Sequence, residues 1–226
     1  YGVSGSIQNS SVTNFVLENQ SGSSKTAAGG LIAQGNGNSI ENCFAQNINL
    51  KVFYSSNVMG IGGIYGYDSV ANSIVNCYAT GSIESDNSNI GGIGGFLNRG
   101  DVTECYSTVD IITDGDYIGG LVGNDRSTEL NNITNNLAIG NIYNKQKAGK
   151  TSRAVGNSKD EQNNYAYEKQ TFNGEITDEN EGAILLSSND LKNVSVYQNR
   201  INLGNSYSYE NINNGILPKL YYSNRT

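Results

Sequence analysis

The chain has 226 residues, of which 28 are glycine, 1 is proline, 3 are cysteine and none is histidine, and its formal net charge is −7. This acidic balance, with scattered Lys and Arg, argues against nucleic acid and anionic membranes as partners. No apolar stretch approaches the ~18 residues of a membrane span. We expect no metal or cofactor in this chain, because His is absent and the cysteines follow no Cys-x-x-Cys spacing.

Two short motifs alternate through the first two thirds of the chain. The first is a glycine pair flanked by apolar residues, with a degenerate copy at Ala154–Gly156; the pairs are Gly29–Gly30, Gly62–Gly63, Gly91–Gly92 and Gly119–Gly120. The second row is Val12–Phe15, Ile40–Cys43, Ile74–Cys77, Val102–Cys105 and Ile133–Asn136. Gly91 and Gly119 lie 28 positions apart. A fixed period of this size indicates stacked repeats, here with two halves of about 14 residues each.

Within a repeat, residues alternate with period two, which predicts strands. In the segment from Cys77 to Ile83, small and apolar side chains share one face, while Tyr78 and Thr80 lie on the other. One repeat then forms one coil of a parallel β-solenoid (β-helix), an all-β fold. The chain is long enough for about five to six coils, stacked about 4.8 Å apart.

Equivalent residues of successive coils are expected to stack in ladders. Ile61, Ile90 and Ile118 form one ladder. Cys43, Cys77 and Cys105 form a second, as free buried thiols, with Phe15 and Asn136 completing the row. A third row contains Asn14, Asn42, Asn76 and Asn135, one position before the cysteines, where Asn suits a left-handed corner.

Departures from the 14-residue spacing predict surface insertions. The longest falls within residues 47–58 and includes Phe53 and Tyr54, and another follows Asp125 and includes Arg126. We interpret residues 1–156 as the repeats, and residues 157–226 as a degenerate coil and aromatic carboxy-terminal cap in the same domain.

The carboxy-terminal third retains a weak similarity to the repeat. Tyr165 is expected at the position of the cysteines, Ser188 or Asn189 is expected to cap a short helix, and residues 214–222 are expected to form a final edge strand. Tyr207 and Tyr209 belong to a cluster of tyrosines that is expected to cover the last apolar rung. The chain begins and ends within structured-looking sequence, so we expect a piece of a larger protein.

A partner surface is predicted where aromatic or charged residues face outward or break the repeat. It consists of Phe53, Tyr54, Tyr78, Tyr106, Arg126, Tyr207 and Tyr209. A different hypothesis is a polysaccharide lyase or hydrolase on a β-helix, which needs paired carboxylates or a Ca²⁺ cluster. The candidates for that chemistry are Glu84, Asp86, Asp110, Asp114 and Asp116.

Two stretches carry a family resemblance. Residues 76–81 (Asn-Cys-Tyr-Ala-Thr-Gly) and 119–123 (Gly-Gly-Leu-Val-Gly) resemble the GLUG repeat of bacterial surface proteins. The ending, with motifs at 189–194, 209–212 and 217–220, is similar to the end of the amino-terminal, non-catalytic region of the immunoglobulin A-specific zinc metallopeptidase family of Gram-positive bacteria. The resemblance implies a secreted or cell-wall protein with a β-solenoid ahead of its catalytic domain. The family's His-Glu-x-x-His motif has no counterpart here, so zinc would belong to that other domain.

The leading functional hypothesis is therefore a non-catalytic solenoid of a zinc metalloendopeptidase. It would position or help bind a host glycoprotein such as immunoglobulin A, and would contact other domains of the same polypeptide as a monomer. The alternative is a stand-alone adhesin or carbohydrate-binding repeat module, because flat polar and aromatic solenoid walls suit glycans.

Overall fold

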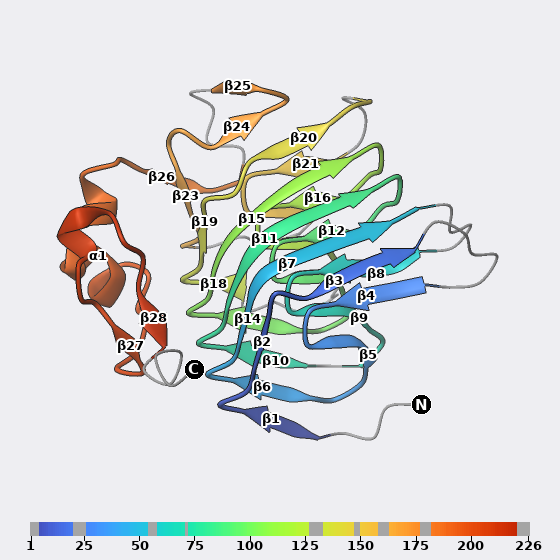
Figure 1. Cartoon of the computed structure of the whole chain (residues 1–226), viewed down its shortest axis with the longest axis horizontal. Helices are drawn as coiled ribbons and strands as arrows, with labels where there is room; N and C mark the ends of the chain where they lie inside the picture. Colours follow the sequence, from blue (N-terminus) through green and yellow to red (C-terminus); the bar gives the residue numbers. More distant parts are fainter. Residues whose placement is uncertain are drawn as a thin grey trace.

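The computed structural model describes residues 5–19, 26–53, 58–70, 72–126, 133–146, 150–157, 163–176 and 182–220. These residues wind into a parallel β-solenoid of about five turns (Figure 1), which confirms the predicted fold class. Each turn passes through four sheets in the same order, and the strands of successive turns pair in parallel within each sheet.

The first sheet contains β1 (Ser6–Gln8), β6 (Ser39–Glu41), β10 (Ser73–Val75), β14 (Asp101–Thr103) and β18 (Ile133–Thr134). The second, which we call the long sheet, contains β2 (Ser11–Thr13), β3 (Val16–Asn19), β7 (Phe44–Val52), β11 (Tyr78–Ser85), β15 (Tyr106–Thr113), β19 (Leu137–Ala138), β20 (Ile142–Asn144), β23 (Tyr165–Tyr167), β24 (Thr171–Phe172), β25 (Glu175–Ile176) and β26 (Ile184–Leu186).

The third sheet contains β4 (Thr26–Gly29), β8 (Val58–Gly62), β12 (Ile90–Gly91), β16 (Ile118–Gly119) and β21 (Thr151–Ser152). The fourth contains β5 (Ile32–Gly35), β9 (Tyr65–Asp68), β13 (Gly94–Leu97), β17 (Val122–Asp125) and β22 (Val155–Asn157). Each glycine pair lies at the tight turn from the third sheet to the fourth.

The glycines are required because the third and fourth sheets touch through their backbones. A Cβ built on Gly91 would overlap the carbonyl oxygen of Gly94 and lie 2.6 Å from the backbone nitrogen of Gly123. Equivalent close approaches recur at Gly29, Gly62 and Gly119. Any side chain at these positions would push the two sheets apart.

The interior ladders follow the predicted register. Ile90 pairs with Ile61 on one side and Ile118 on the other, and all three are fully buried. The three cysteines are free and buried. Burial raises the pKa of Cys77 well above its ordinary value, so this thiol stays protonated in the core.

Two positions in the cysteine row were wrongly predicted. Gln8 pairs with Glu41, so Ser10, not Phe15, lies beside Cys43. Tyr165 pairs with Leu137, so the row continues through Asn136 and Asn164, whose side chains are joined by a 3.0 Å hydrogen bond from Asn136 Nδ2 to Asn164 Oδ1. In both cases the prediction chose an apolar residue at a shifted position along the chain. The residues that do occupy the row, Ser10 and Asn164, are polar and do not resemble the cysteines.

The corner before this row has left-handed backbone in successive turns, as predicted for Asn. The residues with positive φ are Asn9, Asn42, Asn76, Glu104, Asn135 and Asn163. Asn14 also has positive φ, but it belongs to a second corner, where Asn47 Nδ2 donates to Asn14 Oδ1 over 3.2 Å.

The first insertion lies where the spacing predicted it. Asn47 forms a bulge in β7, because Ala79 pairs with Ala45 whereas Gly81 pairs with Ile48. Residues 53–60 separate β7 from Ile61. In the next turn, the shorter stretch of residues 86–89 separates β11 from the equivalent Ile90. Tyr54 lies outside the described residues, as does most of the second insertion after Arg126.

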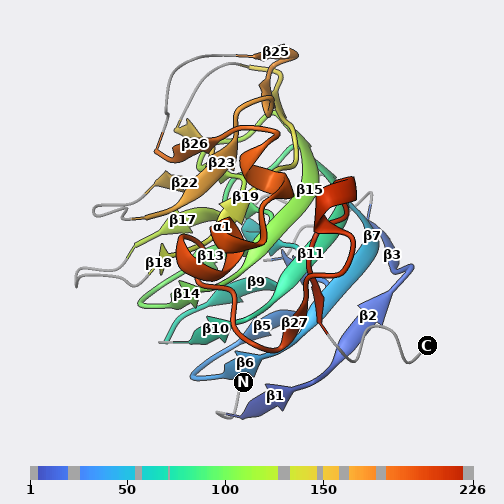
Figure 2. The ribbon, with the colours of Figure 1, turned by 90° about the vertical axis from the view of Figure 1, so that its left-hand side faces the viewer.

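The carboxy-terminal segment, residues 187–220, contains η1 (Asp190–Lys192), α1 (Val194–Asn199), β27 (Tyr207–Ser208), η2 (Ile212–Asn214) and β28 (Lys219–Leu220). Asn193 caps α1 by accepting from the Ser195 backbone N–H, whereas Asn189 makes no side-chain cap before η1. Of the final strand predicted over residues 214–222, only Lys219–Leu220 is a strand, β28, paired antiparallel with β27, and Asn214 ends η2 instead. The segment packs beside the coils instead of covering their last rung (Figure 2).

The glycine contacts generate a stability prediction. Gly91→Ala should lower the free energy of unfolding by about 1–3 kcal/mol or more, because the added Cβ meets backbone atoms that cannot yield. Gly94→Ala is the matched control, since its Cβ would lie 3.4 Å from the Leu97 side chain in ordinary contact. Urea unfolding followed by circular dichroism measures both; equal stability of the two variants would contradict the argument.

A buried carboxylate between the fourth and first sheets generates a second prediction. Asp68 is fully buried and accepts hydrogen bonds from Asn72 Nδ2 and the Asn98 backbone N–H. Burial nevertheless raises its pKa from 3.8 to about 6. The folded chain therefore binds this proton more tightly than the unfolded chain, so Asp68 lowers stability as pH rises from about 4 to 6.

We expect the Asp68→Asn variant to lack this contribution, which amounts to at most about 3 kcal/mol for a shift of this size. The measurement is the free energy of unfolding of both proteins at pH 4, 5, 6 and 7. Their difference should change across this range in favour of the variant at higher pH; a pH-independent difference would refute the assignment.

Candidate functional site

The outer face of the long sheet carries an aromatic and apolar column at the start of its strands. Phe44, Tyr78, Tyr106, Leu137 and Tyr165 are paired in register across successive turns. The Tyr78 ring stacks on Phe44 with centroids 4.9 Å apart and on Tyr106 at 5.0 Å. We call these five residues the outer column.

The carboxy-terminal segment covers the outer column (Figure 2). The Tyr106 hydroxyl donates to the Pro218 carbonyl, and the Tyr207 ring lies 6.1 Å from the Tyr106 ring. At the edge of the contact, Asn202 Nδ2 donates to Glu104 Oε1 over 2.7 Å. The outer column and the segment form a second apolar cluster, separate from the cluster inside the coils.

This packing overturns part of the predicted partner surface. Tyr78 and Tyr106 are each only 2% exposed, and Tyr207 is 1% exposed. The prediction that these three tyrosines face a partner was wrong, because Tyr78 and Tyr106 are covered by the carboxy-terminal segment, to which Tyr207 itself belongs. They pack against one another and form the second cluster instead.

The other predicted surface residues lie apart in the fold. Arg126 is exposed and follows β17, Phe53 is half-buried at the end of β7, and Tyr209 is half-buried in the carboxy-terminal segment. The Tyr209 hydroxyl donates to the Leu203 carbonyl over 2.6 Å. Tyr54 is not among the described residues. These positions come from three different parts of the chain and do not form one site.

Beyond the carboxy-terminal segment, side chains on the outer face of the long sheet are exposed in the part of the chain that the structure describes. Ile112 and Tyr143 are paired in register there and are 38% and 45% exposed. Beside them, the Asn141 backbone N–H donates to Asp110 Oδ1 over 2.8 Å, and the Thr171 hydroxyl donates to Asn141 Oδ1 over 3.0 Å. We call Asp110, Ile112, Asn141, Tyr143 and Thr171 the open wall.

Sequence reasoning missed the open wall, although a signal was present. Residues 139, 141 and 143 alternate with the buried positions Gly140 and Ile142, so Tyr143 shares the outward face of Tyr106. What the pattern does not contain is how far the carboxy-terminal segment extends over that face. The open wall is the part that this segment leaves exposed.

A cleft of about 240 Å³ lies between the carboxy-terminal segment and the long sheet. Its lining residues are Ile139, Tyr167, Ser188, Leu191, Lys192, Gly215 and Leu217. The Tyr167 hydroxyl and Ser188 Oγ are 3.0 Å apart and share a hydrogen bond. Lys192 is exposed at this site.

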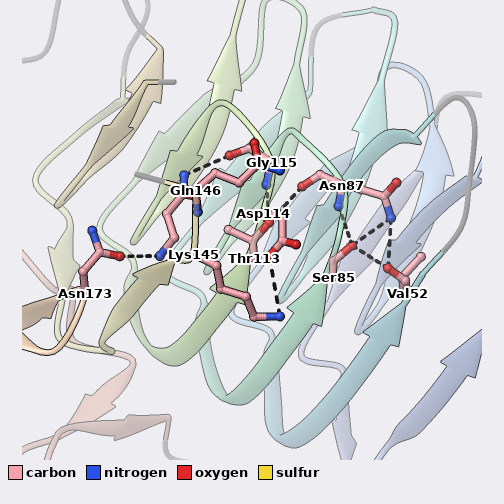
Figure 3. A network of polar contacts seen from close by, with 10 residues as sticks. Val52, Ser85, Asn87, Thr113, Asp114, Gly115, Lys145, Gln146 and Asn173 are labelled. Atoms are coloured by element: carbon pink, nitrogen blue, oxygen red, sulfur yellow. Dashed lines mark hydrogen bonds and ion pairs between the residues drawn. The ribbon is translucent and has the colours of Figure 1, made fainter. Parts of the chain in front are cut away.

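Of the acidic candidates for lyase or Ca²⁺ chemistry, Asp114 lies at a polar corner that links the coils (Figure 3). There, Thr113 Oγ1 donates to the Asn87 carbonyl over 3.0 Å, and Asn144 Nδ2 donates to the Gly115 carbonyl over 2.9 Å. Asp114 is paired with Lys145 at 3.5 Å. In the part of the chain that the structure describes, no three Cys, Asp or Glu residues converge to hold a metal ion.

Comparison with protein-family models, curated proteins and solved structures found no match to this chain. Among the described helices, none is long and apolar enough to cross a membrane.

The covered outer column generates a prediction for Tyr106. Tyr106→Ala should lower the free energy of unfolding by about 3–5 kcal/mol and expose the carboxy-terminal segment to limited proteolysis, because it removes the ring that packs against Tyr78 and Tyr207. Tyr106→Phe keeps the ring and loses the hydrogen bond to Pro218, so about 1 kcal/mol is expected. If both variants resist proteolysis like the parent protein, Tyr106 does not hold the segment.

Proposed function

We propose that this chain is a non-catalytic module that binds a host glycoprotein or its glycans and positions it for a zinc metalloendopeptidase domain of the same extracellular bacterial protein. The observation that carries this proposal is the open wall, an exposed aromatic and aliphatic pair flanked by a carboxylate and an amide. The family resemblance supplies the catalytic context, in which zinc belongs to the other domain.

The chemistry of the open wall suits a sugar. A pyranose ring has an apolar C–H face and a rim of hydroxyl groups. Tyr143 and Ile112 offer an apolar patch, while Asp110 and Asn141 offer hydrogen-bonding groups at its side. Exposed apolar side chains grouped with polar ones mark interaction surfaces. Because these residues lie on or beside paired strands, little conformational entropy would be lost on binding.

The carboxylates that would carry lyase or Ca²⁺ chemistry have other surroundings in the fold. Asp110 accepts a backbone N–H, Asp114 pairs with Lys145, and Asp86 and Asp116 are exposed. A stand-alone adhesin remains the second candidate, favoured by the same open wall. The two are separated by whether a His-Glu-x-x-His domain is encoded in the same polypeptide.

The proposal predicts measurable binding by the isolated chain. Immobilised immunoglobulin A and mucin-type glycoproteins should bind it in biolayer interferometry, and Tyr143→Ala should weaken binding at least fivefold, or by about 1 kcal/mol. Val70→Ser, which alters an equally exposed apolar side chain after β9, is the control and should bind as the parent does.

Unchanged binding by Tyr143→Ala, or equal weakening by Val70→Ser, would count against the open wall as the binding surface. Zinc-dependent cleavage of either glycoprotein by the isolated chain would rule out a non-catalytic role. Enzymatic removal of the glycans separates recognition of sugar from recognition of polypeptide.

A further inference from the structure

We infer that the cleft between the carboxy-terminal segment and the long sheet binds a terminal acidic N-acylated monosaccharide, of the sialic acid class. This inference rests on the proposed function and adds to it the identity of the sugar that is held most firmly. It follows from the shape of the cleft, its lysine, which forms no ion pair with another described residue, its two hydroxyls and its continuity with the open wall.

The cleft is mostly apolar and has walls from two different parts of the chain. Tyr167 belongs to the long sheet and Ile139 directly follows its strand β19, whereas Leu191 and Leu217 belong to the carboxy-terminal segment. Its volume of about 240 Å³ is below the roughly 300–1,000 Å³ of pockets for drug-sized ligands, so it suits one sugar ring. The methyl of an N-acyl group would fill its apolar part.

The positive charge of Lys192 favours a ligand with a carboxylate. Lys192 lines the cleft, and the ion pairs found among the described residues use Lys51, Lys145 and Arg200 instead. The neighbouring carboxylates already have donors. Asp190 accepts from Ser187 and pairs with Arg200 at 3.7 Å, and Glu168 Oε1 accepts from the Ser188 backbone N–H over 3.2 Å. A ligand carboxylate would supply an ion-pair partner that Lys192 does not find among the described residues.

The two hydroxyl groups of the cleft can form hydrogen bonds with the hydroxyl groups of a sugar. Tyr167 and Ser188 are hydrogen-bonded to each other at 3.0 Å, which uses the proton of one of them. The other proton remains available to a ligand oxygen, and both oxygens retain acceptor capacity. Tyr167 also presents an amphipathic ring to the cleft, with an apolar body and a polar tip.

The cleft leads onto the open wall along one stretch of chain. Ile139 lines the cleft, Asn141 lies two residues farther, and Tyr143 two residues beyond that. At about 3.3 Å per residue in extended chain, the path is roughly 13 Å long. A glycan whose terminal acid occupies the cleft can therefore lay its inner sugars on the open wall.

The test uses the whole chain and four probes by isothermal titration calorimetry and saturation-transfer NMR. These are the methyl glycosides of N-acetylneuraminic acid, N-acetylglucosamine and glucuronic acid, and a sialylated oligosaccharide. N-acetylneuraminic acid should bind at least tenfold more tightly than the other two monosaccharides, which lack the carboxylate and the N-acyl group respectively.

Variants then assign the site. Lys192→Gln should weaken binding of the N-acetylneuraminic acid glycoside at least tenfold, Lys192→Arg should stay within about threefold of the parent, and Tyr167→Phe should lose a few-fold. Lys219→Gln is the matched control, because Lys219 is an exposed lysine of the same segment that does not line this cleft. Lys192 is exposed, so its variants should unfold like the parent.

The outcomes separate this inference from the proposed function. Tyr143→Ala should leave monosaccharide binding unchanged and weaken only the sialylated oligosaccharide. If Tyr143→Ala weakens glycoprotein binding but Lys192→Gln does not, the open wall stands and the cleft assignment fails. No binding of the acidic monosaccharide, or equal binding of all three glycosides, overturns the inference outright.

Discussion

The close backbone contact between the third and fourth sheets determines the rest of the architecture. A Cβ on Gly91 would collide with Gly94 and Gly123, and the same holds at Gly29, Gly62 and Gly119, so the backbones of the third and fourth sheets are in direct contact in these coils. The interior beside this contact holds a narrow stack of Ile, Cys, Ala and Val side chains. Such a thin core buries little apolar surface per residue, and the chain adds a second cluster outside the coils, between the outer column and the carboxy-terminal segment.

The interior of the fold could be predicted because its constraints repeat. Ile61, Ile90 and Ile118 occupy equivalent positions in successive coils, so spacing alone fixes their ladder. The predictions were wrong where a position is apolar in some coils and polar in others. Ser10 and Asn164 continue the cysteine row with polar side chains, and the more apolar Phe15 and Tyr165 nearby were mistaken for them. A bulge at Asn47 also shifts the register, which a count of residues cannot place within an insertion.

The exterior was harder to predict, because the direction of a side chain does not determine its exposure. Alternation correctly places Tyr78 and Tyr106 on the outer face of the long sheet. Whether that face meets solvent depends on residues about a hundred positions later, since Pro218 and Tyr207 cover Tyr106. The same long-range packing forms the cleft and bounds the open wall. The repeat period therefore could not predict the candidate site, although it does predict that the Tyr143 side chain points outward.

The position of the cleft couples recognition to the docking of the carboxy-terminal segment. One wall comes from Tyr167 of the long sheet and from Ile139 directly after its strand β19, and the other from the segment through Leu191 and Leu217. A ligand that needs both walls binds only the docked arrangement and must stabilise it by mass action. The segment is held by the outer column, whose stacked rings are set 4.9–5.0 Å apart by the spacing of the coils. The coil spacing imposed by the glycine-rich core thus extends, through the outer column, to the geometry of the site.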